Sequence, residues 1–536
     1  MALEAVVWEA ARARGTSHGK GRRMRRVLLL VMVLPGLLMV SGASLEDAAA
    51  VPPPGDIDNV EYLGNIPMSG LTSLNVTRYG NREVLFAVGR FGLKSFDLRD
   101  PERPELLDEI VSDELRLEGD TTGTFWQSES TNIDQRRKVA YLSRDPRAFG
   151  KPQDQGIAGI YIIDVRDPED LRLRLFHEIP AGHTTTCIND CRYLWSGGPA
   201  PRADQPEEWV GRPIFVTDVR NPNRPYTFPD PVDIGRTDGV TDYSHDVQVD
   251  NTGVAWVSGR GGIRGYWTDG RHHDPLTGRV RNASAWDPIP YAGGGLENPY
   301  TLSGAVHNSE RPIDTSRDAR RNGAGTVDHE RPFRPDADDG ADLEASGYAP
   351  GELLYATDEA FSTCEASGKF YISSLEGSYD GAGWRSTPED PFRLETVGVW
   401  SPYDKEGSNP NTNSCSAHYF KMKDGVVAGS WYGQGTRFLD VTDPTDPIQI
   451  AYYRPDGGSS FYPVWYEDLV YVGDSARGID VIRPDLGAER ASAMRAEVLA
   501  PPLSDAAAIA DTAGFSPDPV YGWSCRLPTD VLTVGA

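Results

Sequence analysis

One segment of this chain, residues 417–455, contains four short runs with the composition of β-strands. HYFKM is followed by VVAGSWY after an Asp-Gly turn, by TRFLDV after Gly-Gln-Gly, and by IQIAYY after the loop DPTDP. Runs rich in Val, Ile, Tyr, Phe and Thr between clusters of Gly, Pro and Asp are strand signals. Four such strands in a row are typical of one blade of a β-propeller, so the pattern should recur along the chain.

The pattern recurs most clearly at a corner where an Asp precedes a Pro-containing turn. The corner occurs in FDLRDPERP (Phe96–Pro104), IDVRDPED (Ile163–Asp170), TDVRNPNRP (Thr217–Pro225) and, shortened, in IDVIRP (Ile479–Pro484). It predicts an all-β fold, a β-propeller of seven four-stranded blades. Six or eight blades remain open as alternatives, because the fourth and fifth repeats are degenerate. The corner aspartates should accept backbone N–H bonds in the turn, since one Asp per blade cannot form the oxygen cage that calcium needs.

The predicted seventh blade has only three strands of its own, SFYPVWY, LVYVGD and GIDVIRP. A strand-like run, NVEYLGNIP (Asn59–Pro67), precedes the first blade without a blade of its own. Pairing this run with the last strand closes the ring and leaves no open sheet edge. We therefore expect the propeller over residues 59–486, with insertions near 269–300 and 312–350, and a C-terminal tail over 487–536.

The first 43 residues have the features of a secretory signal peptide. RRMRR precedes the apolar run Val27–Val40, and small residues at Ser41 and Ala43 suit cleavage. The run is short for a membrane span, and Pro35 interrupts it. With Met24 as an alternative start, the sequence predicts a signal peptide over 1–43, a linker over 44–58 and a secreted, extracellular or cell-surface monomer without a membrane span.

The formal net charge of −26 excludes a nucleic-acid partner, because no cationic face is available to displace counterions. Five cysteines in an exported chain predict disulfides. Cys187 and Cys191 are close enough in sequence to bridge locally, and Cys364 and Cys415 fall on neighbouring predicted blades. Cys525 is then left over. A zinc site at Cys187 and Cys191 is a weaker alternative, because no matching ligands follow at short spacing.

Three longer phrases resemble the LVIVD-repeat proteins, a β-propeller family of exported bacterial and archaeal proteins. They are VLFAVGRFGLKSFDLRDPERP, WYGQGTRFLDVTDPTDP and LVYVGDSARGIDVIRP, and the resemblance extends over residues 60–484. GHTTTC, HNSERP and CSAHYF look like segments of a secreted subgroup. The resemblance implies the fold and says little about activity. The general form is shared with cytochrome-d₁-like and selenium-binding-protein propellers, which raises an enzyme as an alternative.

Four of the nine histidines stand at the start of a predicted first strand. They are His183, His245, His307 and His418, in GHTTT, YSHDV, AVHNS and SAHYF. First strands line the channel of a propeller, so these imidazoles are expected at one mouth, where they suit Zn, Cu, Fe or Ni; propellers with a four-histidine iron centre exist. Asp246, Asn308, Asp358 and Glu359 are candidate partners of the imidazoles. The alternative is a structural role in capping strand backbones, because blades one, two and seven carry no such histidine.

Aromatic and arginine side chains near the strand starts are candidates for a ligand surface: Trp126, Tyr243, Arg260, Arg264 and Trp431. The glycines of SGRGGIRGYW allow close backbone approach, and its arginines could hold an anion. Core packing and hairpin turns are the alternative explanations. No linear motif of a hydrolase, phosphate loop, dinucleotide fold or EF-hand occurs, so the catalytic residues are unknown.

Two functions follow as hypotheses. The first is a secreted, non-enzymatic scaffold that binds a protein, a glycan or a small molecule at one face. The second is an exported oxidoreductase or hydrolase that depends on a divalent transition metal held by the four histidines. The two differ in whether the imidazoles meet at one point or are committed to backbone carbonyls.

Overall fold

The computed structural model describes most of the predicted propeller. The described residues are 55–121, 123–126, 128–189, 191–198, 213–232, 243–250, 254–260, 262–274, 277–291, 306–311, 353–359, 368–375, 395–409, 415–423, 425–488 and 490–492. The predicted signal peptide, most of the linker, the insertion at 312–350 and most of the tail lie outside them. Within these ranges, no helix has the length and apolar character needed to cross a membrane.

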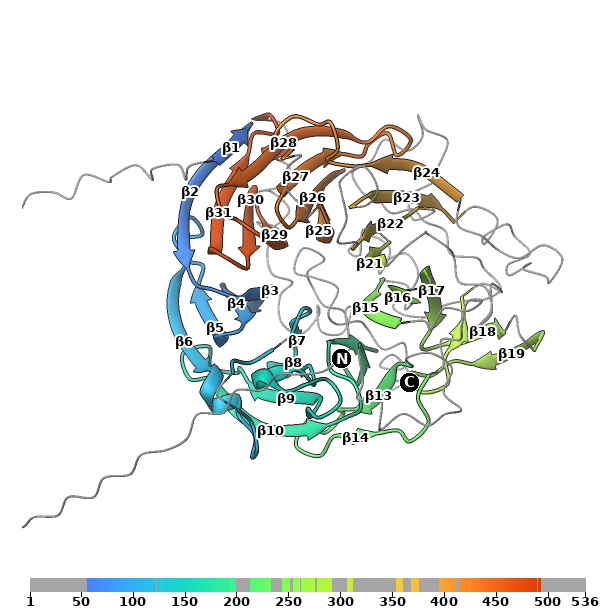
Figure 1. Cartoon of the computed structure of the whole chain (residues 1–536). Coiled ribbons are helices and arrows are strands. Elements are labelled where there is room, and N and C mark those ends of the chain that lie inside the picture. The colour runs from blue at the N-terminus through green and yellow to red at the C-terminus, as the bar shows by residue number, and fades with distance from the viewer. Residues whose placement is uncertain are drawn as a thin grey trace, which may run out of the picture. The chain divides into compact units, whose positions relative to one another are not determined.

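Seven antiparallel sheets, six with four strands and one with five, are arranged around a central axis (Figure 1). Blade 1 consists of β3 (Leu71–Tyr79), β4 (Arg82–Gly89), β5 (Gly92–Asp97) and β6 (Glu105–Val111). Blade 2 consists of β7 (Asn132–Asp134), β8 (Val139–Arg144), β9 (Gly159–Asp164) and β10 (Arg172–Glu178). Blade 3 consists of β11 (Thr184–Ile188), β12 (Tyr193–Gly197), β13 (Phe215–Asp218) and β14 (Tyr226–Thr227). Two short 3₁₀ helices occur here: η1 (Ser112–Leu115) precedes blade 2, and η2 (Ala148–Gly150) lies within it, between β8 and β9.

The remaining blades follow the same order from the axis outward. Blade 4 consists of β15 (Tyr243–Val249), β16 (Val254–Arg260), β17 (Gly262–Trp267) and β20 (Ile289–Pro290), and blade 5 of β21 (Val306–Glu310), β22 (Leu353–Asp358), β23 (Phe370–Ser374) and β24 (Glu395–Trp400). Blade 6 consists of β25 (Ala417–Lys423), β26 (Val426–Trp431), β27 (Gly435–Asp440) and β28 (Ile448–Pro455). Blade 7 has β29 (Ser460–Tyr466), β30 (Leu469–Asp474) and β31 (Gly478–Pro484). The insertion predicted near 269–300 contains a hairpin of β18 (Arg271–Asp274) and β19 (Arg279–Asn282), which lies within blade 4, between β17 and β20.

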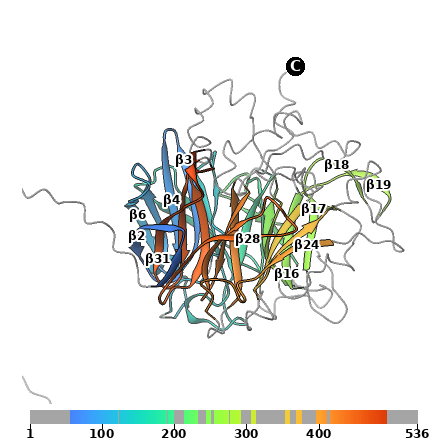
Figure 2. The ribbon, with the colours of Figure 1, turned by 90° about the horizontal axis from the view of Figure 1, so that it is seen from above.

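The first strand of every blade lies innermost, and the strands run along the axis between the two faces (Figures 1 and 2). Apolar side chains fill the space between neighbouring blades. One such cluster joins Tyr141 and Ile160 of blade 2 to Leu194 of blade 3, and another joins Tyr355 of blade 5 to Phe420 of blade 6. Because each blade buries its faces against its neighbours, the core is a ring of interfaces that leaves the axis to the inner strands.

A strand from the start of the chain completes the seventh blade, as the sequence predicts. β2 (Val60–Pro67) pairs with β31 from Val60 opposite Pro484 to Pro67 opposite Gly478. The preceding strand β1 (Gly55–Asp58), at the end of the segment predicted as linker, adds to the outer edge of blade 6 by pairing with β28. The ring is therefore closed by hydrogen bonds between segments more than 400 residues apart.

The corner aspartates accept hydrogen bonds in their turns. Oδ1 of Asp97 accepts the N–H of Arg99 (2.8 Å) and Oδ1 of Asp440 accepts the N–H of Thr442 (3.0 Å), with the same arrangement at Asp164 and Asp218. Asp480 instead accepts from the side chain of Asn65 on the closing strand β2 (2.7 Å). These contacts give the repeated Asp a structural role in the blade.

One disulfide lies at the end of the inner strand of blade 3. Cys187 and Cys191 are bridged, and Asn189 and Cys191 adopt left-handed backbone conformations in the turn between them. Cys415 is also disulfide-bonded, while Cys364 and Cys525 lie outside the described residues. Local bridging of Cys187 and Cys191 is therefore present, and the predicted pairing of Cys364 with Cys415 stays a prediction.

Candidate metal centre

Five of the seven inner strands have a β-bulge near the end where each begins. The ladder shifts by a residue at His245 in β15, and a shift also spans His307 in β21 and His418 in β25. Bulges at Thr72 in β3 and Phe461 in β29 occupy the same place. A bulge re-aims side chains that strict alternation would turn toward a neighbouring blade. The fold thus presents the bulge position of five repeats at the same mouth of the channel, whereas His183 directly precedes the regularly paired β11.

Four imidazoles and one carboxylate converge at this mouth. Oε2 of Glu129 lies 3.3 Å from Nε2 of His183, 3.3 Å from Nε2 of His245, 3.5 Å from Nε2 of His307 and 3.9 Å from Nε2 of His418. Nε2 of His183 and Nε2 of His245 are 3.1 Å apart. Metal–nitrogen bonds of about 2.0–2.1 Å place neighbouring ligand atoms roughly 3 Å apart, so the spacing fits donors around one ion.

Neighbouring groups orient two of the rings. Nδ1 of His183 lies 3.1 Å from Oδ2 of Asp145, and Nδ1 of His418 lies 2.8 Å from the carbonyl oxygen of Phe461. Both partners are acceptors, so each Nδ1 carries the proton and each Nε2 keeps its lone pair for the centre. This is the outer arrangement that holds metal-binding histidines in the correct tautomer.

Burial keeps two of the imidazoles neutral. Burial lowers the pKa values of His245 and His418 well below the ordinary value, and electrostatic repulsion from His307 lowers both further. For Glu129, burial acts to raise the pKa, but His183, His307 and His245 together bring it well below its usual range. A carboxylate beside the neutral imidazoles of His245 and His418 is a donor set suited to a cation.

Several donor atoms at the centre are not satisfied by the protein. Among the described residues, Oε2 of Glu129 and Nε2 of both His307 and His418 are buried without a hydrogen-bond partner. Leaving a buried polar atom unsatisfied costs about 1–3 kcal/mol. A purely structural histidine cluster would be expected to pair these atoms, whereas a cation at the point of convergence would satisfy them together. The donor set therefore fits a metal ion.

A second carboxylate stands beside the cluster on its more exposed side. Oε2 of Glu359 lies 3.8 Å from Nε2 of His245, and its other oxygen accepts a hydrogen bond from the hydroxyl of Tyr432 (2.6 Å). The side chain of Glu359 is 18% exposed, whereas those of His307 and His418 are fully buried. His307, Glu359 and His418 also form a group with metal-binding spacing, so Glu359 is a further candidate ligand.

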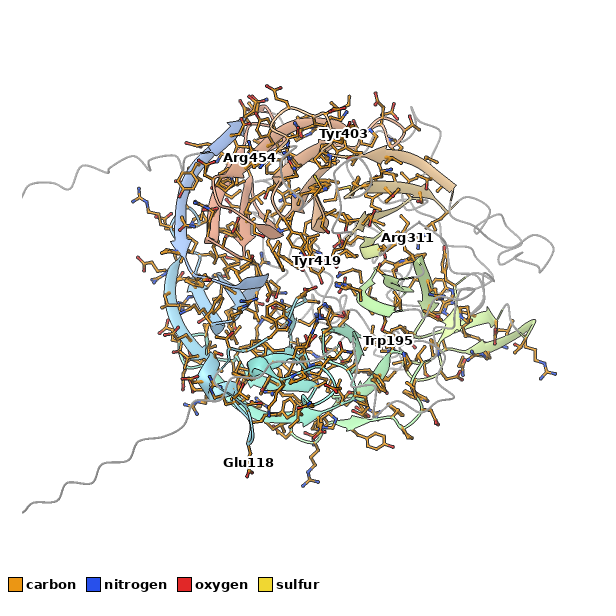
Figure 3. The ribbon with its side chains drawn as sticks, viewed as in Figure 1. Glu118, Trp195, Arg311, Tyr403, Tyr419 and Arg454 are labelled. Atoms are coloured by element: carbon orange, nitrogen blue, oxygen red, sulfur yellow. A yellow bond between two sulfur atoms is a disulfide. The ribbon has the colours of Figure 1, made fainter. Side chains whose placement is uncertain are left out.

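Tyr419, which follows His418 on β25, lies near the axis of the ring (Figure 3). Its ring contacts His307 edge-on with centroids 4.6 Å apart, and it contacts His418 at 5.0 Å. Beyond it follow Tyr462, at 4.5 Å from Tyr419, and the ion pair of Lys421 with Glu310. Side chains thus fill the channel behind the centre.

The candidate outer residues occupy different places. Asp246 accepts from the amide of Gln248 (2.6 Å), and burial raises the pKa of its carboxyl. Asn308 lies against the hydroxyl of Thr357. Burial raises the pKa of Asp358 to about 6; Lys369 opposes this and Glu359 adds to it. Of these four residues, the structure brings Glu359 to the cluster, and the partners of Nδ1 of His183 and His418 are Asp145 and the carbonyl of Phe461.

The candidate ligand residues are similarly divided. Trp126 lies at the same mouth as Glu129, partly buried, and its backbone oxygen accepts the N–H of Asp145. Arg264 is buried in β17. Trp431 is fully buried and donates to the carbonyl of Gly368 (2.7 Å), a core position rather than a ligand surface. The side chains of Tyr243 and Arg260 lie outside the described set.

Sequence reasoning missed Glu129 and Asp145. Glu129 lies in FWQSES, in the segment predicted as the first strand of blade 2. The predicted ligand set contained only histidines, and this segment has none. Its place in the repeat, one blade before His183, was the available signal. Asp145 follows the second strand of blade 2, and its contact with His183 depends on tertiary packing that no local pattern encodes.

Comparisons with known proteins add the fold alone. No protein-family model and no curated protein matches the chain in sequence. Its structure is similar to the β-propeller domain of Cps50 (Swd1) from Myceliophteria thermophila, at 9% identity and a TM-score of 0.44, over 79% of this chain and 99% of that one. It is also similar to the periplasmic gluconolactonase PpgL from Pseudomonas aeruginosa, at 12% identity and a TM-score of 0.39, over 72% and 85% of the two chains. At these values neither similarity bears on the function of this chain.

Proposed function

We propose that the chain binds one transition-metal ion at the channel mouth and acts as a metal-dependent oxidoreductase. The single observation that carries the proposal is the convergence of four Nε2 atoms on one carboxylate oxygen, within 3.3–3.9 Å. The ligands would be His183, His245, His307 and His418, with Glu129 as the fifth. The scaffold hypothesis instead requires imidazoles committed to backbone carbonyls, and Nδ1 of His418 is the one such contact seen at the described ring atoms of this cluster.

The number of donors favours a redox-active metal. Catalytic zinc is generally held by three protein ligands and structural zinc by four. Five convergent donors, with Glu359 as a sixth nearby, exceed both arrangements and suit a five- or six-coordinate ion such as iron. Imidazole and carboxylate together are ligands that iron accepts. For this reason we favour an oxidoreductase over a hydrolase.

We also propose that the protein is an exported, divergent member of the LVIVD-repeat proteins. The repeated Asp-Pro corner, with its recurring bond from Asp to the N–H two residues on, supports a common blade unit. The signal-like N-terminus and the disulfide at Cys187 support export to an oxidising compartment.

The test is the metal content of the mature protein, purified without an affinity tag and measured by mass spectrometry. We expect near-stoichiometric iron, or another first-row metal after reconstitution, in the wild type and its loss in His307→Ala and Glu129→Gln. His177→Ala is the matched control, because His177 lies on β10 and bonds Thr227 instead of the cluster. Circular dichroism shows whether each variant is folded. A folded wild type that binds no metal even after reconstitution would overturn the proposal.

A further inference from the structure

Two consecutive blades leave the ring of metal donors open on one side. At the bulge position, blade 7 provides Phe461 and blade 1 provides Thr72, neither of which has a side chain suited to a metal. The ring of Phe461 lies 4.1 Å from that of His418 and 5.0 Å from that of Tyr432. Phe91 packs against the same apolar cluster as Phe461. The side of the mouth without ligands is therefore an aromatic wall.

The described side chains behind the centre are buried or paired, whereas the mouth is partly exposed. Behind the histidines, Tyr419 is fully buried and Tyr462 nearly so. Asp246 is bonded to Gln248, and Lys421 to Glu310, one layer further along the axis. At the mouth itself, by contrast, Glu359 is partly exposed. Groups that select a reactant should accordingly lie around Phe461, Trp126 and the turns between them.

One guanidinium is held in this region without a carboxylate. Arg90 lies in the turn between β4 and β5, at the end of blade 1 where β3 begins. Its carbon at the centre of the guanidinium lies 4.3 Å from the centroid of the Trp126 ring. Its side-chain stem crosses Gly70, where a Cβ would come within 2.7 Å of it, so that a side chain at residue 70 would displace Arg90. Among the described residues, no carboxylate pairs with this exposed arginine.

Its surroundings differ from those of the neighbouring arginines. Arg147 is bound to Asp145 (2.7 Å) and Arg144 to Asp120 (2.6 Å). Trp126, beneath Arg90, has a buried indole N–H for which the described residues provide no acceptor. A chain with a net charge of −26 thus holds an exposed guanidinium on the face of an indole ring, without a carboxylate partner among the described residues. A guanidinium held in this way is suited to a carboxylate.

We propose that Arg90, held on the ring of Trp126, binds the carboxylate of a small organic acid whose apolar body lies along Phe461 and whose other end reaches the metal centre. The inference rests on the proposed function for the last of these contacts. The stem of Arg90 is fixed on Gly70 and on Trp126, so little side-chain freedom is lost when an anion binds. The substrate class is therefore an arylalkyl or similar apolar carboxylic acid.

The test is calorimetric binding of acetate, phenylacetate and 3-phenylpropionate to metal-loaded protein, beside the neutral amide phenylacetamide. We expect phenylacetate or 3-phenylpropionate to bind best, and Arg90→Met to weaken that binding about tenfold, as for a lost charge-assisted contact. Phenylacetamide binding should not change. Trp126→Phe keeps the ring and removes the N–H, and should cause a smaller loss. Arg172→Met is the matched control, because Arg172 is exposed and paired with Asp170 at the opposite end of blade 2.

Metal content measured on the same samples separates this inference from the proposed function. Full metal occupancy with equal phenylacetate binding by wild type and Arg90→Met would overturn the inference and leave the metal centre standing. A folded wild type without metal would overturn the proposed function, while an Arg90-dependent loss of phenylacetate binding would still support the anion subsite. Failure of all three acids to bind saturably to metal-loaded protein would also overturn the inference.

Discussion

At the scale of the residue, the chemistry of this protein depends on one position of a structural repeat. The bulge position holds His245, His307 and His418 in three blades, and Thr72 and Phe461 in two others. Phe461 is part of the aromatic wall beside the cluster, whereas the hydroxyl of Thr72 donates to a backbone carbonyl. The repeated bulge therefore positions three of the proposed donors and one residue of the wall, according to the side chain that occupies it.

Asp145 should act on the centre through His183. Asp145→Asn weakens the acceptor for Nδ1 of His183, and loss of such an outer partner typically lowers metal affinity by about 10–100-fold. We expect that loss in a competition titration against a chelator, with the number of bound metal ions unchanged. Asp218→Asn, at a corner of blade 3, is the control. Equal affinities for Asp145→Asn and wild type would show that His183 does not need this partner.

Asp164 should make the free energy of unfolding depend on pH in the acid range. Burial acts to raise its pKa, but hydrogen bonds from Arg166 and Arg174 lower it to about 2, below the unfolded value of about 3.9. A depressed pKa stabilises the fold above the unfolded pKa, and the contribution is lost as pH falls through the folded pKa. Asp164→Asn should thus cost about 1 kcal/mol near pH 6, after allowance for screening. The difference should shrink toward zero near pH 2.

Urea unfolding of both proteins across this pH range gives the measurement. Asp113→Asn, in an exposed pair with Arg116, serves as the control for a surface carboxylate. A difference between wild type and Asp164→Asn that stays constant down to pH 2 would contradict the prediction.

At the scale of the element, hydroxyl groups on second strands fix the backbone that carries the donors. The hydroxyl of Ser143 on β8 donates to the carbonyl of His183 (2.9 Å), and that of Thr357 on β22 donates to the carbonyl of His418 (2.6 Å). Each bond runs from one blade to the next. The blades are thereby held in register at the height of the site, in addition to the apolar packing between them.

Replacing Thr357 with Val should loosen this arrangement at constant shape. The change removes the donor to the His418 carbonyl, and leaving that buried acceptor unsatisfied costs about 1–3 kcal/mol. We expect a loss of that size in urea unfolding and faster release of bound metal to a chelator. Thr445→Val, whose hydroxyl bonds only the exposed Asp443, should change neither quantity. Unchanged metal release in a destabilised Thr357→Val would limit the role of the bond to folding.

The elements were largely predictable from the sequence, and the site only in part. Alternating strands, the Asp-Pro corners and the orphan strand before blade 1 predicted seven blades and their closure, because these signals are local or repeat. The placing of His183, His245, His307 and His418 at one mouth followed from the repeat. Glu129 and Asp145 did not, because their roles depend on which blade follows which around the axis. Arg90 was missed because the feature that singles it out, the absence of a carboxylate partner among the described residues, depends on tertiary packing.

At the scale of the whole molecule, the ring depends on the closing strand β2. A chain that begins at Ser69 lacks β1 and β2, which leaves β31 with an open edge. It also loses Leu63 and Ile66, so the core residues against which these two side chains pack become exposed. We expect a loss of about 3 kcal/mol or more in unfolding free energy, and a tendency to aggregate. A chain that begins at Asn59 lacks only β1 and should lose much less unfolding free energy. A chain that begins at Gly55 keeps both strands and should be as stable as the full chain.

Thermal unfolding and light scattering of these three chains provide the comparison. Equal stability of the chains that begin at Ser69 and Asn59 would show that β2 is dispensable.

The donors of the proposed centre come from consecutive blades spread along the sequence from Glu129 to His418. A growing chain holds the complete donor set only after His418 in blade 6 has been added, so the five-donor site forms only when blades 2 to 6 have docked. Loading must then follow folding, and the metal acquired is set by the ions present where folding is completed. Compartment, and not affinity alone, would decide which element this protein carries.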